Sequence, residues 1–272
     1  MSFTLFICAL PIGHLGDITM RVKTVLKETA IIFCEDTRVT KSCLMSHGIW
    51  ADQQLVRMDQ YQEKHAIHRF DQFILNQNVA YVSDAGTPTI SDPGALLVAH
   101  ARHLSVPVVL LPGPSALTAF MAGAGILCTS FYFGGFLSKK SGDRDAILTS
   151  IIDQKLVGIW FESPKRILTT ILAIQSIDPL LPVVVAKEIT KPHERFFSGG
   201  VADVYTALSV HNLRGEWVFL VDARHHQSDD MTGYHQRALQ LKDIGVSGKQ
   251  VKQLAPLLNM NRNKLYEMFQ EL

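Results

Sequence analysis

The chain has 272 residues, of which 47 % are hydrophobic and 19 % charged, with 26 basic and 25 acidic side chains. At roughly 150 residues per domain, this length predicts two domains. The apolar content excludes disorder for the bulk of the chain, because disordered segments combine low hydrophobicity with high net charge. The net charge of +1 excludes a global positive field that would attract nucleic acid, so any such binding must use a local patch.

The cysteines and the N-terminus are typical of a protein from a reducing compartment. The four cysteines have no CxxC spacing, so neither a zinc site nor a redox pair is indicated. Cys8 and Cys34 fall in apolar runs, and we expect them to be buried as small hydrophobic residues. The N-terminus lacks a basic region followed by a long apolar stretch, so we expect no secretion signal and a cytoplasmic location.

A long segment without charge raises the possibility of a membrane span. No Asp, Glu, Lys or Arg occurs between Arg102 and Lys139. A spanning helix needs about 20 consecutive apolar residues. Prolines and glycines interrupt this segment at Pro107, Pro112, Gly113, Pro114, Gly123 and Gly125. We therefore expect a buried strand, turn, helix and strand, and no contact with a membrane.

The first half of the chain alternates strand and helix patterns. Apolar runs predict strands at residues 5–10, 30–34, near 55, 79–83 and 107–111. The spacing predicts a helix that Asp17 caps and that runs to residue 26, and further helices at 41–47, 62–75 and 93–104. This alternation is typical of an α/β fold with a mainly parallel sheet covered by helices on both faces.

The second half predicts another α/β domain. Its expected elements are a helix at 114–123, an aromatic strand at 130–136, a polar, basic loop at 139–144, a strand at 156–161, a helix at 164–177 and strands at 182–187 and 217–221. Polar residues at 224–230 predict a linker. We therefore expect an N-terminal α/β domain at 1–113, a second α/β domain at 114–224, and a linker with a short helical C-terminal tail at 225–272.

The tail has the pattern of two short helices separated by a turn. Ser247 would cap a helix that runs to residue 258, a turn would follow at 259–262, and a second helix would cover 263–269. This arrangement resembles a helix-turn-helix, and the cations expected on its surface are Lys249, Lys252, Arg262 and Lys264. A small helical cap with solvated lysines is the alternative, and the sequence leaves both open.

Four breaks rich in glycine, proline and polar residues follow four of the predicted strands, at 11–17, 35–38, 83–88 and 112–115. Ligands of parallel α/β sheets bind beyond the carboxyl ends of the strands, and glycine lets the backbone approach a ligand closely. Ser115 opens a predicted helix, whose free N–H groups suit a carboxylate or a phosphate. Asp84 could accept a hydrogen bond from a ribose or an amine. Each break alone would be only a turn, but four at one edge predict a binding site.

Several common motifs are absent. No GxGxxG follows the first strand, and the chain contains neither GxxxxGK[ST] nor GxSxG. These absences disfavour a P-loop nucleotide hydrolase and an α/β-hydrolase. His65 and His68 could share a helix face, but we expect that face to be solvated, and His225 and His226 to belong to the linker. We therefore expect no metal site.

Seven segments together carry a resemblance to a known family. LPIGHLGDIT at 10–19, EDTR at 35–38, VSDAGTPTISDPG at 82–94 and LPGPSA at 111–116 resemble the tetrapyrrole-methylase superfamily. FESPKR at 161–166, AKEITK at 186–191 and GEWVFLV at 215–221 resemble its small-subunit ribosomal RNA methyltransferase I branch, which methylates the ribose 2′-hydroxyl of a cytidine. The likeness covers nearly the whole chain. It departs from the usual residues of that branch at His14, Lys165 and Lys187.

The resemblance implies a cofactor, partners and binding residues. It implies S-adenosylmethionine in a cleft between the two α/β domains, small-subunit (16S) ribosomal RNA as substrate, and a homodimer. The residues expected to bind the cofactor lie in the breaks: Pro11, Gly13, Asp84, Ala85, Gly86, Thr87, Pro112, Gly113, Pro114 and Ser115. The cations expected to bind the RNA lie in the same segments and in the tail: Arg38, Arg166, Lys191, Lys249 and Arg262.

The implied reaction requires a ribose hydroxyl to lose its proton as the methyl group arrives. Alignment against a reactive sulfonium can supply much of the rate, and a positioned base adds about 10²- to 10⁴-fold. The candidate catalytic residues lie at or just past the ends of two predicted strands: Lys187, Glu188 and Glu162. Lys187 could be the base or could hold a phosphate, and Glu162 could instead form a structural ion pair with Arg166.

Two other functions stay open at this point. A methyltransferase that keeps the cofactor but acts on a tetrapyrrole carbon is the first, although the DAGTP and ESPKR segments and the tail argue against it. A helix-turn-helix regulator whose α/β part only senses a metabolite is the second. Transfer of a labelled methyl group to purified small subunits separates these functions from the RNA methyltransferase.

Overall fold

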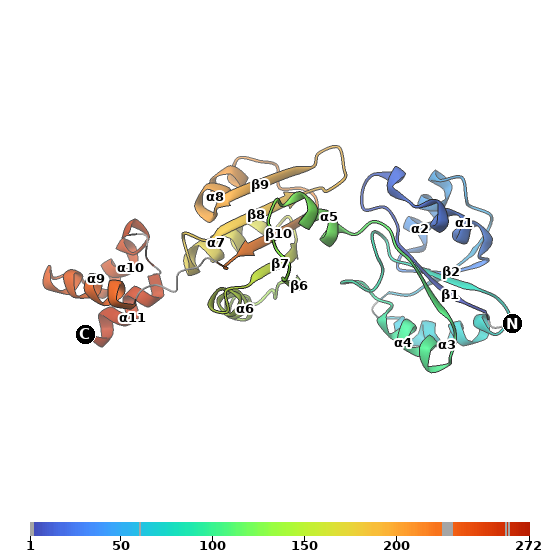
Figure 1. Ribbon diagram of the computed structural model, residues 1–272, viewed down its shortest axis with the longest axis horizontal. Coiled ribbons are helices and arrows are strands. Elements are labelled where there is room, and N and C mark those ends of the chain that lie inside the picture. Colours follow the sequence, from blue (N-terminus) through green and yellow to red (C-terminus); the bar gives the residue numbers. More distant parts are fainter. Residues whose placement is uncertain (1–2, 60, 225–230, 259, 261) are drawn as a thin grey trace. The chain divides into compact units, whose positions relative to one another are not determined.

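The computed structural model describes residues 3–59, 61–224, 231–258, 260 and 262–272 (Figure 1). The chain divides into two compact units. Residues 1–122 and Ile189–Pro192 form unit 1, and Gly123–Glu188 with 193–272 form unit 2. The domain boundaries expected after residues 113 and 224 stay predictions. The linker prediction falls mostly on residues 225–230, which lie outside the described residues.

Unit 1 contains a sheet of five parallel strands. The strands are β1 (Leu5–Cys8), β2 (Ile31–Cys34), β3 (Gln54–Arg57), β4 (Val79–Val82) and β5 (Val108–Leu111), in the order β3-β2-β4-β1-β5. Every neighbouring pair is parallel, which confirms the prediction for the first half. β1 ends two residues earlier than expected, because Leu10 leaves the strand and forms an isolated bridge with Gly86.

Helices cover both faces of this sheet. They are α1 (Met20–Glu28), α2 (Thr37–Ser46), α3 (Glu63–Ile74) and α4 (Ala95–His103), with the short η1 (Leu15–Asp17) before α1 and α5 (Ala116–Gly123) after β5. One apolar cluster joins α1 and α2 to the sheet, and a second joins α3 and α4 to its other face (Figure 1). Cys8 and Cys34 are fully buried in the first cluster, as expected.

Two helix starts differ from the predictions. Asp17 was expected to cap α1, but it lies in η1, and the cap is Thr19, whose hydroxyl accepts from the Val22 N–H at 3.2 Å. α2 starts earlier than expected, at Thr37 rather than 41, because Asp36 caps it. The Asp36 carboxylate accepts from the Arg38 N–H at 2.8 Å and so satisfies a free donor of the first turn.

Unit 2 contains a mixed sheet. Its strands are β6 (Tyr132–Phe136), β7 (Val157–Glu162), β8 (Pro182–Lys187), β9 (Arg195–Gly200) and β10 (Trp217–Asp222), in the order β6-β7-β10-β8-β9. Only β6 and β7 pair in parallel, and the other three pairs are antiparallel. The register places Trp217 opposite both Glu162 and Lys187, and Lys187 opposite Arg195.

The sequence analysis missed three elements of unit 2. α6 (Ser141–Asp153) begins inside the predicted polar loop, because its first turn is polar and only its later positions are buried, including Leu148 and Ile151. β9 and α8 (Val201–Ser209) were not expected at all. β9 is mostly exposed and ends in two glycines, so it lacks the continuous apolar run that predicts a strand.

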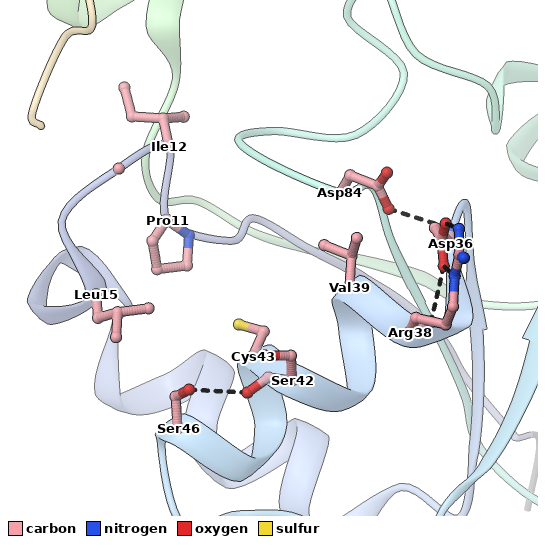
Figure 2. A pocket seen from close by; sticks show the side chains of 11 residues that line it. Pro11, Ile12, Leu15, Asp36, Arg38, Val39, Ser42, Cys43, Ser46 and Asp84 are labelled. Atoms are coloured by element: carbon pink, nitrogen blue, oxygen red, sulfur yellow. Dashed lines mark hydrogen bonds and ion pairs between the residues drawn. The ribbon is translucent and has the colours of Figure 1, made fainter. Parts of the chain in front are cut away.

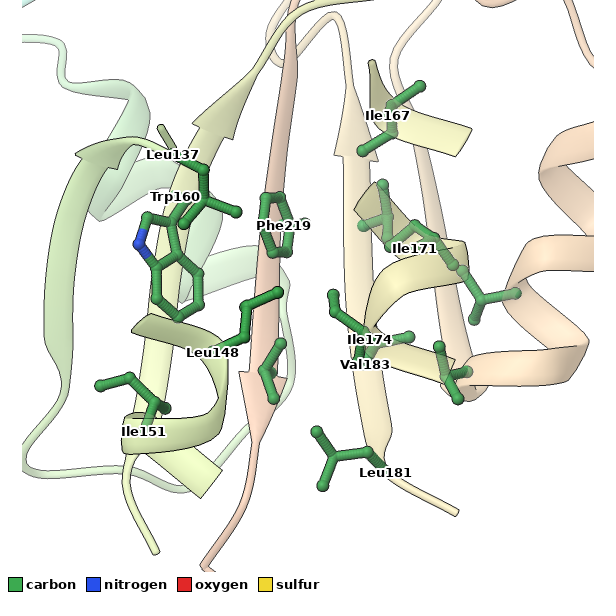
Figure 3. Close-up of a cluster of buried hydrophobic side chains, with 14 of the residues drawn as sticks. Leu137, Leu148, Ile151, Trp160, Ile167, Ile171, Ile174, Leu181, Val183 and Phe219 are labelled. Atoms are coloured by element: carbon green, nitrogen blue, oxygen red, sulfur yellow. The ribbon is translucent and has the colours of Figure 1, made fainter. Parts of the chain in front are cut away.

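The core of unit 2 lies between this sheet and α6, α7 (Ile167–Ile177) and α8. Its centre is an aromatic stack in which the rings of Trp160 and Phe219 lie 5.4 Å apart (Figure 3). Gly134 and Gly158 make room for the Trp160 ring, because a Cβ at either position would overlap it. The predicted strands at β6 and β7 are confirmed, but only β7 is buried: β6 lies at the edge of the sheet, and its Tyr132 and Phe136 are exposed, so the burial expected for this strand is wrong.

The described part of the tail is helical, as predicted. It contains α9 (Met231–Asp243), α10 (Gly248–Leu254), the short η2 (Pro256–Leu258) and α11 (Arg262–Glu271), which share an apolar cluster of their own. Ser247 caps α10 through a capping box with Gln250, as its sequence position suggested. Within the described residues, no helix is long and apolar enough to cross a membrane.

Candidate functional site

The four breaks follow strands that are neighbours in the sheet of unit 1. β2, β4, β1 and β5 lie side by side and run in the same direction. The loops that follow them therefore leave the same edge of the sheet, as the sequence analysis expected. This is the edge at which parallel α/β sheets bind their ligands.

A cavity of about 640 Å³ opens at this edge (Figure 2). It is lined by Pro11, Ile12, Gly13, Leu15, Asp36, Arg38, Val39, Ser42, Cys43, Ser46 and Asp84. It therefore brings together three of the predicted cofactor residues and the predicted RNA-binding Arg38. Its wall on α2 was not predicted: residues 39, 42, 43 and 46 have the spacing of one helix face, but they carry no glycine, proline or charge that would have marked them as part of a site.

An ion pair at the cavity sets the local electrostatics. The Asp36 carboxylate accepts from the Arg38 side chain at Nε (3.1 Å) and Nη2 (2.7 Å). These hydrogen bonds hold the pKa of Asp36 well below its usual range. The Arg38 side chain is 88 % exposed, so it can also reach a ligand. The Asp36 N–H donates to Asp84 Oδ1 at 3.0 Å, which orients the Asp84 carboxylate beside the cavity (Figure 2).

Three carboxyl groups near this edge have raised pKa values. Burial is the main cause for Glu35, Asp84 and Asp92, and repulsion by neighbouring carboxylates adds to it. A partly desolvated carboxylate gains from a ligand that donates a hydrogen bond, because water solvates it poorly. Asp84 is thus suited to accept from a hydroxyl or an amine. Among the described residues, no group of three His, Cys, Asp or Glu could hold a metal ion.

The loop after β4 is fastened to two other breaks. Gly86 and Leu10 exchange two backbone hydrogen bonds of 2.9 Å, and the Thr87 hydroxyl donates to the Pro114 carbonyl at 3.0 Å. Thr89 and Ser91 have positive φ values of 75° and 67°. Backbone strain of this kind clusters at ligand sites, where surrounding contacts maintain it. The structure thus brings Gly86, Thr87 and Pro114 together with the loop after β1.

The loop after β5 packs tightly against the end of β1. A Cβ on Gly113 would lie 3.0 Å from the Cβ of Ala9. Pro112 and Pro114 flank this glycine, and Ser115 comes directly before α5, as predicted. Only a residue without a side chain fits this approach unchanged, and the same absence leaves the Gly113 backbone accessible to a ligand.

A segment from the second half of the chain completes unit 1. The Thr190 hydroxyl accepts from the His14 N–H at 3.1 Å. A Cβ on Gly13 would lie 2.6 Å from Thr190 Oγ1 and would also overlap the Lys191 side chain. The predicted RNA-binding Lys191 therefore lies against the loop after β1, beside a predicted cofactor residue.

Two candidate catalytic residues, Lys187 and Glu188, end β8 in unit 2. The Lys187 ammonium donates to the Asn212 carbonyl and lies 5.5 Å from the centre of the Trp217 ring. The Glu188 carboxylate accepts from the Glu216 N–H at 2.8 Å, and the Glu188 backbone has a positive φ of 53°. Both side chains are half-buried and held by the segment before β10. Their catalytic roles stay predictions.

Glu162, the third candidate, lies in a buried network. Its side chain has no exposed surface, and Arg166 binds it through Nε (2.7 Å) and Nη2 (2.9 Å). The Thr170 hydroxyl donates to the same carboxylate at 2.8 Å. Arg166 also donates to the Leu137 carbonyl at 2.9 Å, which joins the ends of β6 and β7. The ion pair considered in the sequence analysis is thus present, and a catalytic role for Glu162 stays a prediction.

A second cavity, of about 380 Å³, lies around Lys187 and Glu188. Its other lining residues are His193, Arg195, Phe197, His211, Asn212, Arg214 and Gly215. The sequence analysis did not single out these residues, since it did not predict β9. The signal that could have found them is the density of cations and histidines at 187–195 and 211–214.

The cations of the tail differ in their surroundings. Lys249 and Arg262, the two predicted to bind RNA, are exposed at the beginnings of α10 and α11. Lys252 and Lys264 were expected to be exposed but are half-buried. The Lys252 ammonium lies 3.9 Å from the centre of the Tyr266 ring, because its aliphatic stem packs along the helix pair.

Most of the chain is similar to known proteins. The family model for Tetrapyrrole (Corrin/Porphyrin) Methylases matches residues 4–205. A protein of Neisseria meningitidis serogroup A named ribosomal RNA small subunit methyltransferase I is 34 % identical over 270 residues, which cover 97 % of this chain and 92 % of that protein.

Two solved structures share the fold. A diphthine synthase has a TM-score of 0.65 at 14 % identity, covering 82 % of this chain and 90 % of its own. A uroporphyrin-III C-methyl transferase from Thermus thermophilus, complexed with S-adenyl homocysteine, has a TM-score of 0.55 at 17 % identity, covering 81 % of this chain and 98 % of its own. At these identities the structures show the fold alone.

Proposed function

Because this chain belongs to the tetrapyrrole methylase family and, within it, to the ribosomal RNA small subunit methyltransferase I proteins, we propose that it methylates the ribose 2′-hydroxyl of a cytidine in 16S ribosomal RNA, with S-adenosylmethionine as methyl donor. One observation carries the choice of substrate. The likeness to a protein named for the small subunit covers 97 % of this chain, whereas the family model ends at residue 205. A tetrapyrrole acceptor and a regulator that only senses a metabolite account for less of the chain.

The residues at the edge of the first sheet fit the methionine-derived cofactor. Gly113 is exposed and has no side chain to cover its backbone, Asp84 presents an oriented carboxylate, and the cavity that Asp84 lines holds about 640 Å³. Ser115 offers the free N–H groups of the α5 start for the carboxylate of the cofactor. The full proposed set is Pro11, Gly13, Asp84, Ala85, Gly86, Thr87, Pro112, Gly113, Pro114 and Ser115. When bound, the cofactor supplies an electrophilic sulfonium methyl group.

The residues of this chain then have to orient the ribose and remove its proton. Lys187 and Glu188 are fixed by Asn212 and Glu216, so their polar atoms are held in place before the substrate arrives. We assign to the Lys187 ammonium the orientation of the acceptor, and to the Glu188 carboxylate the removal of the hydroxyl proton as the new oxygen–carbon bond forms. Glu162 acts with them through Arg166, since its carboxylate is enclosed by that side chain.

Binding of a large RNA requires cations beyond the catalytic pair. We assign this role to Arg38, Arg166, Lys191, Lys249 and Arg262. Arg38, Lys249 and Arg262 are exposed. A net charge of +1 gives little long-range attraction, so these local cations carry the contact with phosphate.

We also propose a cytoplasmic homodimer. The segment between Arg102 and Lys139 carries no charged residue, yet several of its apolar side chains are exposed. The most exposed are Leu110 at 60 %, Leu127 at 91 % and Phe136 at 61 %. Leu110 and Phe136 lie on β5 and β6, each at an edge of its sheet. Apolar, uncharged edges of this kind are suited to burial against a second copy.

The test is transfer of a labelled methyl group from S-adenosylmethionine to purified small subunits, followed by mapping of the modified nucleotide. The expected result is label on the 2′-oxygen of one cytidine of 16S RNA. A reduced tetrapyrrole is offered in a parallel reaction. Label in the tetrapyrrole and none in the RNA, or no label in either, would overturn the proposed function.

A further inference from the structure

The second cavity lies where three strands of unit 2 come together. β8 ends at Lys187, β9 begins at Arg195 and β10 begins at Trp217, and the register sets these three residues side by side across the sheet. Residues directly opposite each other in a sheet point to the same face. Consistent with this, the Lys187 ammonium lies over the Trp217 ring, and both Lys187 and Arg195 line the cavity.

The lining of this cavity is net positive, with three cations and one carboxylate. Lys187 and Arg195 are like charges at directly opposed positions, an arrangement that destabilises a sheet. Arg214 adds a third cation to the same cavity, and the one lining carboxylate, Glu188, accepts from a backbone N–H. An anion between the cations would offset their repulsion.

The floor and one wall of the cavity are held in place by local contacts. The Phe197 ring lies 5.1 Å from the His211 ring and 6.3 Å from the Trp217 ring, centre to centre. Asn212 accepts from the Arg214 N–H at 3.0 Å, and the Trp217 indole donates to the Leu213 carbonyl at 2.8 Å. The segment that carries Arg214 is therefore ordered before any ligand binds.

We propose that this cavity binds a backbone phosphate of the RNA acceptor, with Arg195 and Arg214 as the residues that grip it and Lys187 between them. This inference rests on the proposed function, because it names the part of the chain that holds the substrate. Arginine side chains bind phosphate through two parallel N–H donors. Arg195 and Arg214 are both exposed and can therefore reach a phosphate. A volume of about 380 Å³ accommodates a phosphate with part of its sugar. His193 and His211 add donors at the rim.

The experiment removes two charges from the cavity and two from elsewhere. The test variant is Arg195→Gln with Arg214→Gln, and the control is Lys27→Gln with Lys155→Gln. Lys27 and Lys155 are exposed, lie outside both cavities, and their loss changes the net charge equally. Binding of each protein to 16S RNA is measured from about 50 to 300 mM salt, and cofactor affinity by calorimetry verifies folding.

The slope of log affinity against log salt reports the phosphate contacts. We expect the test variant to lose about 0.7 in slope for each single-strand phosphate released, and its KM for small subunits to rise at least tenfold. The control should keep the wild-type slope, and cofactor affinity should stay within twofold in both. Arg195→Lys with Arg214→Lys should recover most of the slope but not the full affinity, because lysine keeps the charge without the paired donors.

Equal slopes in the test variant and the control would overturn the inference. Inorganic phosphate is also titrated as a separate ligand. A test variant that binds this phosphate more weakly but keeps its affinity for 16S RNA would likewise overturn the inference. Methyl transfer by the wild type is measured in the same preparations. A wild type that transfers no methyl group to small subunits refutes the proposed function, whereas the salt slopes still decide whether the cavity binds RNA phosphate.

Discussion

Enlarging Gly113 tests whether the loop after β5 holds the cofactor through its backbone. A Cβ at this position would lie 3.0 Å from the Cβ of Ala9, about 0.5–1 Å closer than an optimal carbon–carbon contact. Ala9 is 1 % exposed, so it cannot move aside without disturbing the end of β1. Overpacking of this kind costs about 1–3 kcal/mol. If the loop shifts to relieve this contact, its backbone moves away from the cofactor. Gly113→Ala should therefore weaken cofactor binding a few-fold, and Gly113→Val, whose larger side chain would also block the backbone approach, at least tenfold, or about 1.4 kcal/mol.

The assay is calorimetric titration with S-adenosylmethionine, with the melting temperature measured alongside. Gly142 provides the matched control, because a Cβ there would meet nothing within 4 Å. Gly142 also lies inside α6, where alanine is favoured over glycine by up to about 1 kcal/mol. Gly142→Ala and Gly142→Val should leave cofactor affinity unchanged. A folded Gly113→Val protein with wild-type affinity would refute the proposed role of this loop.

Four further predictions address other parts of the site. Calorimetry should show that Asp84→Ala weakens cofactor binding at least tenfold. Because the pKa of Asp84 is raised, acidification should begin to weaken the wild-type affinity at a higher pH than it would with an ordinary carboxyl group, and Asp84→Asn should abolish this pH dependence. Lys187→Met and Glu188→Gln should each lower single-turnover methylation of small subunits more than tenfold and change cofactor affinity less than threefold; full activity in both variants would remove the pair from the mechanism. The wild type should keep its activity in EDTA, and a loss of activity there would contradict the metal-free chemistry. Glu162→Ala should lower the free energy of unfolding by about 3 kcal/mol or more in urea, since it leaves the Arg166 charge without its buried partner; wild-type stability would contradict the structural role of the ion pair. Truncation after Arg224 should leave cofactor affinity intact and raise the KM for small subunits, most strongly at low salt, because the lost phosphate contacts make binding less salt-dependent. An unchanged salt slope would make the tail only a cap.

The strands of the first sheet and their parallel arrangement could be predicted from the sequence, because both follow from local patterns in the chain. Continuous apolar runs mark buried parallel strands, and a break follows each of the four strands that meet at the binding edge: three of the breaks are rich in glycine and proline, and the one at 35–38 is polar. Helix boundaries were less predictable. The cap at Asp36 lies within a segment that was expected to be a loop, so the start of α2 was predicted four residues too late.

The second cavity, in unit 2, could not be predicted from the sequence, because it depends on the pairing between β8 and β9. β9 has an exposed pattern with Phe196, Phe197 and two glycines, which has neither the alternation nor the continuity of a typical strand. Without that strand, Arg195 has no assigned position. Only the register that sets Lys187 opposite Arg195 shows that cations at separate places in the sequence meet.

The short segment after β8 leads along the backbone from unit 2 into unit 1. Glu188 belongs to unit 2, whereas Ile189–Pro192 belongs to unit 1, where Thr190 accepts from the loop after β1. Glu188 and Thr190 both have positive φ values, 53° and 66°, which is rare for a β-branched residue such as threonine. Each such conformation costs about 1–3 kcal/mol and persists only where surrounding contacts maintain it. Those contacts reach the loop after β1 on one side and the segment before β10 on the other. A substitution that relaxes this strain would therefore disturb the proposed cofactor loop and the proposed acceptor residues together.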